Sequence, residues 1–161
     1  MPPENLQDLI DALTQTPDTV AGLVKDLSGP DLSVKNSPDE FSVVENVCHL
    51  RDIELEGYTA RINRILRENN PSLPDIDGSR LAVEREYHRQ DLSEALKAFA
   101  SARKQNTQTL KGLVTEEFDR EGTLEGVGSV TIRAIMLMML DHDADHVRDL
   151  FLISARPNIS S

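Results

Sequence analysis

The sequence predicts an all-α protein built as a four-helix bundle. Four segments place apolar residues at the three- and four-residue spacing of a helix face, and no segment shows a convincing strand pattern. Long connections separate some of these segments, as in bundles that contain a crossover. The 161 residues are enough for one domain with a sizeable apolar core. We therefore expect a single domain over residues 1–161.

The first helix is expected at Glu4–Leu27. Its apolar stripe begins with Leu6, Leu9, Ile10 and Leu13. Thr16 followed by Pro17 has the form of an N-cap with proline at the first helical position, so this helix is expected to be kinked or split there. The stretch Ser28–Glu40 is rich in glycine, proline, asparagine and serine, which predicts a loop.

The second helix is expected at Glu40–Asn69. Ser42 and Glu45 have the S-x-x-E spacing of a capping box, and the segment NNPSLP ends the helix. Residues 69–90 then form a long connection, with a short helical turn expected at Leu81–Tyr87. A connection of this length suggests a crossover rather than a tight turn.

The third helix is expected at Leu92–Val114, with Asp91 as its N-cap. Thr115–Ser129 predicts a second loop, which is rich in glycine near its end. The fourth helix is expected at Val130–Ser154 and is followed by a short tail.

Composition excludes several classes of function. The formal net charge of −11 argues against a surface that neutralises nucleic-acid phosphates. The single cysteine, Cys48, excludes an internal disulfide and fits a reducing cytosol. The N-terminal residues lack the pattern of a signal peptide, and no run of about 18 apolar residues predicts a membrane span. We expect a cytoplasmic protein with neither nucleic-acid nor membrane partners.

Two histidines stand out on the fourth helix. His142 and His146 are one helical turn apart and share a face with Asp149. That face is apolar for its first two turns, and imidazoles do not normally replace Leu or Phe in a core layer. A divalent-metal site explains this pattern, and a pair of hydrogen-bonded core histidines explains it equally well.

A third histidine favours the metal site. His49 lies in the second helix among Glu45, Asp52, Ile53 and Glu56, while the main apolar positions lie mostly elsewhere around the helix. Three imidazoles from two helices can bind one divalent cation and leave positions open for water or substrate. Imidazole suits zinc, nickel, copper and iron, so the ligand type alone does not select the metal.

The segments around these histidines resemble a known family. FSVVENVCHLRDIE (Phe41–Glu54) and MLDHDADHVRDL (Met139–Leu150) resemble the two signature regions of the DinB/YfiT-like metalloenzymes, and LSEALKAFASARKQNTQTLKGL resembles their third helix. The resemblance extends over roughly residues 6–153. It implies an up-down-down-up bundle with a divalent ion, zinc or nickel, held by His49, His142 and His146.

Two departures from the family pattern affect the surroundings of the site. Phe41 stands where many members have tryptophan, and Asp149 stands where many have glutamine. Asp149 lies one turn after His146, so it is a candidate partner of that ligand or a candidate base, with surface solvation as the alternative. Glu45 and Glu56 lie one and two turns from His49, so either is a further candidate base, and the sequence does not rank them.

Two other reactive residues are expected to lie outside the site. His88, in the long connection, is interpreted as a surface histidine. Adjacent helical residues diverge by about 100 degrees, so Cys48 should point away from a metal that His49 faces. An inert buried thiol is therefore expected.

The leading functional hypothesis is a small metalloenzyme whose open site activates a thiol or a water molecule. The resemblance places thiol S-transfer above hydrolysis, with a small-molecule substrate, a low-molecular-weight thiol as co-substrate, and a homodimer as a possible assembly. The alternative is a non-catalytic metal-binding or stress-associated protein, in which the ion is structural or the site vestigial.

Overall fold

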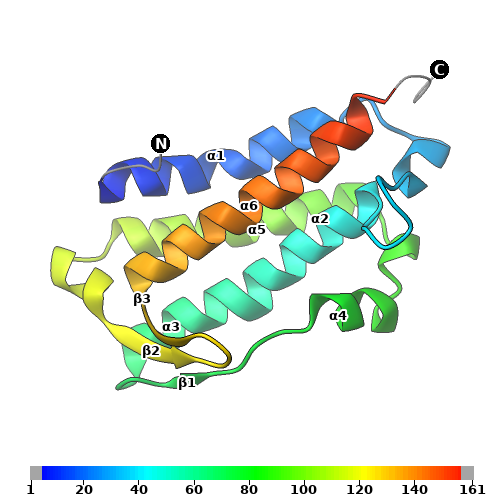
Figure 1. Cartoon of the computed structure of the whole chain (residues 1–161). Helices are drawn as coiled ribbons and strands as arrows, with labels where there is room; N and C mark the ends of the chain where they lie inside the picture. The colour runs from blue at the N-terminus through cyan, green and yellow to red at the C-terminus, as the bar shows by residue number, and fades with distance from the viewer. Residues whose placement is uncertain (1–4, 157–161) are drawn as a thin grey trace.

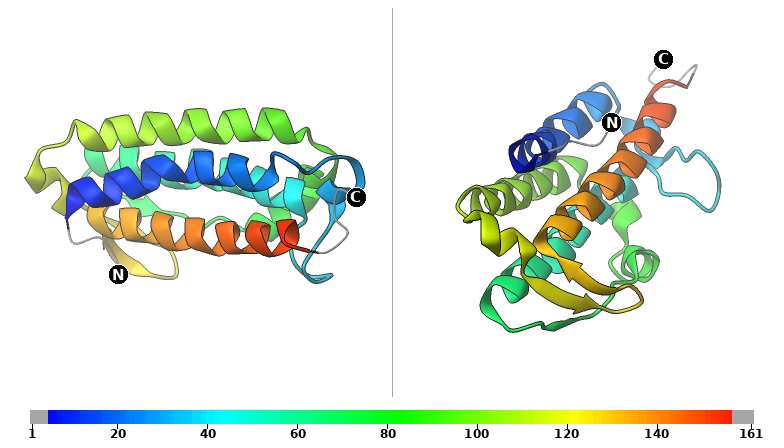
Figure 2. Two further views of the ribbon diagram at one scale, coloured as in Figure 1. Left: turned by 90° about the horizontal axis from the view of Figure 1, so that it is seen from above. Right: turned by 60° about the vertical axis from the view of Figure 1, so that its left-hand side comes forward.

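Four long helical segments lie side by side in the computed structural model, which describes residues 5–156 (Figure 1). They are α1 (Leu6–Val24), the run that contains α2 (Val43–Asp52) and α3 (Ala60–Arg67), α5 (Leu92–Lys111), and α6 (Ile132–Ser154). Helices α1 and α6 run in one direction, while α2–α3 and α5 run in the other (Figures 1 and 2). The predicted up-down-down-up bundle is confirmed. Glu4 and the tail after residue 156 lie outside the described residues.

The sequence predicts a kink or a split at Thr16-Pro17, and the helix is not split there, because α1 continues through Pro17. Proline has no N–H to donate to the carbonyl four residues earlier, which here belongs to Leu13. The guanidinium of Arg103 donates to that carbonyl instead, at 2.9 Å. The hydroxyl of Thr16 donates to Asp143 at 2.7 Å and does not cap a new helix. Tertiary hydrogen bonds therefore replace the local bond that Pro17 removes.

The second helical run contains a π-helical segment, Ile53–Thr59, between α2 and α3. The predicted capping box begins the run, because the backbone N–H of Ser42 donates to Glu45 and that of Glu45 donates to the Ser42 hydroxyl. Within the π segment the hydroxyl of Thr59 donates to the carbonyl of Glu54, five residues earlier, at 2.9 Å. A π segment widens the helix by one residue per turn and is often found at functional sites.

The long connection carries a short helix, α4 (Gly78–Glu84), close to the helical turn that the sequence predicts. A one-turn 3₁₀ segment, Tyr87–Arg89, follows it. The carboxylate of Asp52 in α2 accepts hydrogen bonds from Tyr87 and Arg85. These bonds fix the end of the connection to α2, and they therefore hold α4 against the bundle.

A small three-stranded sheet corrects the expectation of no strands. Strand β1 (Ser72–Leu73) pairs in parallel with β2 (Glu121–Leu124), and β2 forms an antiparallel hairpin with β3 (Gly128–Thr131). Strands of two to four residues are too short to show a clear alternating pattern. A Cβ at Gly122 would lie 2.8 Å from Cδ1 of Leu73 and 3.0 Å from Cγ1 of Ile65, so any side chain here would have to displace these two.

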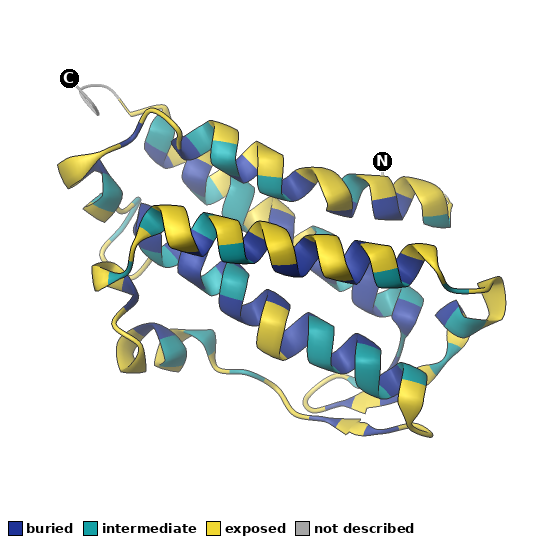
Figure 3. Ribbon diagram, turned by 180° about the vertical axis from the view of Figure 1, so that it is seen from behind, coloured by how far each residue is buried: buried dark blue, intermediate teal, exposed yellow. Residues whose placement is uncertain are grey.

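The apolar core consists of two clusters, and the buried stripes of the helices face inward (Figure 3). The first lies towards the hairpin and includes Leu13, Ile62, Ile65, Leu110, Ile135 and Met136. The second includes Val20, Val43, Val47, Phe99, Leu150 and Ile153. None of the described helices is long and apolar enough to span a bilayer.

A buried polar layer separates the two clusters. Arg103 of α5 is 1% exposed and donates two hydrogen bonds to Glu54 and two to Asp143, all between 2.7 and 2.9 Å. Asn106 also donates to Glu54. Together with the Leu13 carbonyl, these groups join α1, the π segment, α5 and α6. We call Arg103, Glu54, Asp143, Asn106 and Thr16 the arginine layer.

The arginine layer predicts a large stability effect for Arg103→Met. The substitution leaves two carboxylates buried without their cation, which costs about 3–5 kcal/mol in comparable pairs. Urea denaturation should therefore show a free energy of unfolding lowered by about that amount. Lys97→Met in the same helix is the matched control, because Lys97 is exposed and its ammonium lies 4.0 Å from Glu94. Equal effects of the two substitutions would contradict the proposed importance of this layer.

Candidate metal centre

The structure brings the three predicted histidines together. One ring nitrogen from each histidine lies within 4.8 Å of those of the other two, with His49 on α2 and both His142 and His146 on α6. The Nε2 atoms of His49 and His142 are 2.9 Å apart. Within residues 5–156 this is the one group of histidine, cysteine and acidic side chains with the geometry to hold a metal ion, and no carboxylate belongs to it.

Asn46 fixes the orientation of His146. Its side-chain N–H groups donate to the carbonyls of Phe41 and Ser42, at 3.2 and 2.9 Å, so its oxygen is left to face the imidazole. That oxygen lies 2.7 Å from Nδ1 of His146. Nδ1 must then carry the proton, which leaves the lone pair of Nε2 free for a metal. Sequence analysis missed Asn46, although its place one turn after an N-cap and one before His49 was visible.

Gly78, the first residue of α4, packs directly against the ring of His49. A Cβ at this position would lie 2.4 Å from Cε1 and 2.7 Å from Nδ1 of that ring, so any side chain would displace the imidazole. The same Nδ1 is buried and has no hydrogen-bond partner among the described residues. The connection therefore forms a close wall behind His49, and the opposite nitrogen faces the other two histidines.

All three imidazoles are neutral at pH 7 because their pKa values are lowered. Burial, together with the neighbouring His142, lowers the pKa of His49 to about 4. Burial and the two other histidines lower the pKa of His146 to about 2. Burial also lowers the pKa of His142. Metal ligands must be deprotonated, so the histidines match the donor set of a divalent ion that prefers imidazole, with fewer protein ligands than a closed structural site uses.

Aromatic rings line the cluster on two sides. Phe41 lies 5.1 Å from the ring of His49 and 6.4 Å from that of His146, measured between centroids. Tyr58, in the π segment, meets His142 edge-on at 6.0 Å. Phe41, which stands where many family members have tryptophan, thus lies beside the histidine cluster.

The candidate bases differ in their surroundings, and the carboxylate of Glu56 accepts two hydrogen bonds from Arg85. Burial raises the pKa of Glu45, but hydrogen bonds from Ser42 and the charge of Lys35 outweigh it, so the pKa is lowered overall. Burial, with a contribution from Glu40, raises the pKa of Asp149. Neither carboxylate belongs to the histidine group. Of Glu45 and Asp149, only Asp149 has a pKa that is raised towards neutral pH.

The remaining reactive residues lie where the sequence predicts. His88 is exposed. Cys48 is buried, and its sulfur faces Gln90 at 3.6 Å. Burial raises the pKa of this thiol to about 11, so it stays protonated at neutral pH.

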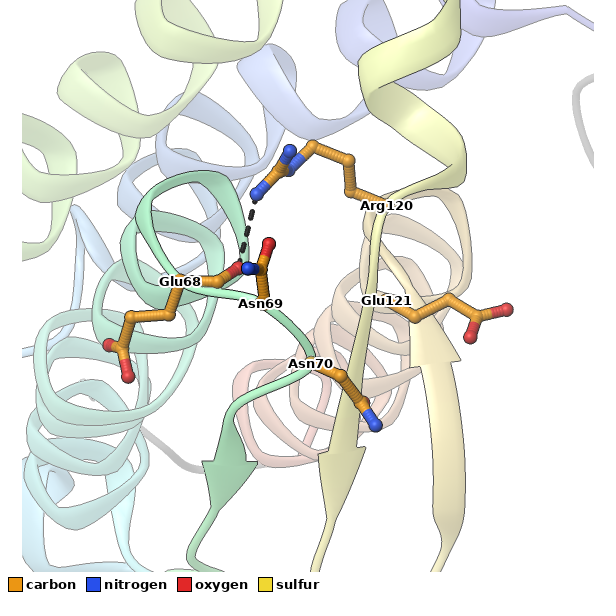
Figure 4. A pocket seen from close by; sticks show the side chains of 5 residues that line it. All are labelled: Glu68, Asn69, Asn70, Arg120 and Glu121. Atoms are coloured by element: carbon orange, nitrogen blue, oxygen red, sulfur yellow. Dashed lines mark hydrogen bonds between the residues drawn. The ribbon is translucent and has the colours of Figure 1, made fainter.

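A pocket of about 250 Å³ lies near the sheet and contains none of the site residues (Figure 4). Arg120 crosses it and donates to the carbonyls of Ile65 and Glu68, at 3.0 and 3.1 Å. These carbonyls belong to the last turn of α3, so Arg120 satisfies the helix end. In this pocket Arg120 therefore has a structural role.

Gly78→Ala should weaken metal binding without unfolding the protein. The methyl group would push His49 out of register with the other two ligands, and we expect a loss of at least about tenfold in affinity for Zn²⁺. Gly22→Ala is the control, because a Cβ at this helical position has no atom within 4 Å. Isothermal titration of both variants with zinc measures the difference. An unchanged affinity in Gly78→Ala would show that the wall behind His49 is not rigid.

The metal-free protein should lose stability as the pH falls below about 6.5. Between 6.5 and about 4 the unfolded chain binds protons that folded His49 and His146 exclude, so the free energy of unfolding falls by roughly 1.4 kcal/mol per pH unit for each histidine. Denaturant unfolding at pH 5 to 7 measures this slope. His146→Gln should make it shallower, whereas the exposed His88→Gln should not; identical slopes would contradict the burial effect.

Comparison with known proteins agrees with this architecture. The solved structure of YfiT from Bacillus subtilis, described as a probable metal-dependent hydrolase with an unusual four-helix bundle topology, superposes with a TM-score of 0.87. The two chains are 19% identical, and the match covers 96% of this chain and 91% of that one, which shows a shared fold. No curated protein matches the sequence. The model of the DinB superfamily matches residues 12–150, and the chain belongs to this superfamily.

Proposed function

We propose that the protein is a small metal-dependent enzyme in which His49, His142 and His146 hold one divalent ion, zinc or nickel. The observation that carries this proposal is the convergence of three neutral imidazoles from two helices with no carboxylate among them. Three protein ligands are the number that catalytic zinc sites use, because a further position is needed for water or substrate.

The ion, when bound, would supply Lewis acidity that lowers the pKa of a bound thiol or water and polarises an electrophile. The chain contributes the rest. Asn46 holds His146 in one tautomer, and Gly78 keeps the His49 ring in place. Asp149, with its raised pKa, is the proposed proton acceptor, and Glu45 is the second candidate.

We propose thiol S-transfer to or from a small molecule in preference to hydrolysis. The reason is that the two histidine segments resemble those of family members with thiol-dependent activity. Hydrolysis is supported by the description of YfiT. We also propose that the protein is cytoplasmic, that its co-substrate is a low-molecular-weight thiol and that it assembles as a homodimer. Binding of nucleic acid is not proposed, because the chain carries a net charge of −11.

The alternative is a non-catalytic protein in which the ion is structural, or the site vestigial. One observation favours a structural role. The three histidines come from two helices, so an ion bound to them would connect these helices. Against it stands the arginine layer, which already connects α1, α5 and α6 with the π segment. A bundle with two apolar clusters and this layer should fold without metal.

His146→Ala separates the two functions. If the site is catalytic, the variant should lose metal, from about one ion per chain to almost none, and lose activity, but remain helical with a small change in melting temperature. Metal analysis and circular dichroism measure both quantities. His88→Ala is the control, because it removes an exposed histidine and should leave the metal content unchanged.

Other results would change the assignment. Cooperative unfolding of the wild-type protein by a chelator at ambient temperature would favour the structural role, because binding free energy would then be folding free energy. An unchanged metal content in His146→Ala would contradict the assignment of this histidine as a ligand.

A further inference from the structure

Arg61, in the first turn of α3, is a buried cation without a close counter-ion. Its side chain is 9% exposed, and the nearest carboxylate oxygen, of Asp75, lies 4.0 Å from Nη2. Asp75 is itself 73% exposed. The Nε atom of Arg61 is buried with no hydrogen-bond partner among residues 5–156. A guanidinium removed from water normally requires hydrogen bonds and an opposite charge to offset the loss of solvation.

Arg103 shows how the same chain treats its other deeply buried arginine. That guanidinium has two carboxylates and one carbonyl within 2.9 Å, in a fully buried position. Arg61 has no hydrogen bond to any described residue, apart from the loose ion pair with Asp75. The donors of Arg61 are therefore free for a group that the protein does not provide.

Tyr58 connects Arg61 to the metal centre. The guanidinium carbon of Arg61 lies 5.7 Å from the Tyr58 ring centroid, and the same ring meets His142 at 6.0 Å. The Tyr58 residue is buried, with 5% of its surface exposed. A guanidinium with an unpaired Nε–H thus lies next to an aromatic ring that itself contacts a candidate metal ligand.

The long connection that precedes α5 packs along the side of the helix that carries Gly57 and Arg61. Ile76 lies 3.4 Å from the position that a Cβ would take on Gly57, and that position is 3.9 Å from the guanidinium carbon of Arg61. Gly78, two residues after Ile76, packs on His49. The segment from Asp75 to Gly78 therefore runs along the helix from Arg61 to the metal centre.

We propose that Arg61 and the hydroxyl of Tyr58 bind a carboxylate or related oxyanion of the substrate, whose other end reaches the metal centre. The proposal rests on the proposed function and narrows its substrate to an anionic small molecule. The planar guanidinium offers paired N–H donors that match a carboxylate, and the phenol adds a third. The chain as a whole repels anions, with a net charge of −11, so recognition needs a local cation.

A purely structural role for Arg61 and a role in ligand binding predict different effects of Arg61→Met on stability. If its contacts with Tyr58 and Asp75 stabilised the fold, Arg61→Met should lower the melting temperature. If Arg61 is held for a ligand, the apolar replacement should leave the melting temperature unchanged or raise it, because an uncompensated buried charge is removed.

Ligand binding tests the proposal directly. Zinc-loaded protein is titrated calorimetrically with 3-mercaptopropionate and with its neutral analogue 3-mercaptopropionamide, which share a thiol for the metal. We expect the carboxylate to bind about tenfold more tightly or better, as one charge-assisted hydrogen bond would give. Arg61→Met should abolish this preference, and Tyr58→Phe should reduce it.

Arg67→Met is the matched control. Arg67 lies in the same helix and is exposed, so the substitution removes an equal charge without touching the proposed subsite. A preference that persists in Arg61→Met, or that Arg67→Met removes equally, would overturn the proposal. A wild-type protein that binds both ligands equally would overturn it as well, while leaving the metal function in place.

Failure of metal binding can be distinguished from failure of the proposed anion subsite. If the wild-type protein takes up no zinc, the proposed function is contradicted. The subsite is then tested on the metal-free protein by the melting-temperature shift that 3-mercaptopropionate produces. A rise that depends on Arg61 and is absent with the amide supports anion binding, and no rise overturns it.

Discussion

The arginine layer is the interaction on which the rest of the structure depends. Arg103 replaces the hydrogen bond that Pro17 removes from α1, and it also neutralises one carboxylate from the π segment and one from α6. Because hydrogen bonds to a guanidinium are directional, these contacts allow one axial position for each helix, whereas apolar surfaces alone tolerate sliding. The layer therefore sets the register of the bundle.

The register of α6 decides where the candidate metal ligands lie. Asp143 points into the arginine layer, and its neighbour His142 points towards α2, about 100 degrees around the helix. On the other side, Glu54 enters the same layer from the π segment that begins four residues after His49. Both histidine-bearing helices are thus tied to Arg103 close to their ligands, which makes the approach of the imidazoles a consequence of the buried charges.

The details of the site depend on contacts between neighbouring segments. The N-cap at Ser42 exposes carbonyls that hold the Asn46 amide, and that amide fixes the tautomer of His146. The hydrogen bonds of Asp52 attach the connection to α2, and the same connection brings Gly78 onto His49. A histidine cluster assembled from such contacts is preorganised, which would favour tight and specific coordination of an ion.

The sequence by itself determined the four helices, the caps at Ser42 and Asp91 and the three histidines, because helical periodicity, the Ser42–Glu45 box and the HxxxH spacing are local signals. It also predicted the burial of Cys48 and the exposure of His88. Only the tertiary structure decided that α1 continues through Pro17, that β1 pairs with a distant hairpin, and that Asn46 and Gly78 support the ligands. These features rest on partners such as Arg103, which lies 90 residues from the Leu13 carbonyl that it satisfies. No local pattern can specify such a partner, because its position is set by how the helices pack.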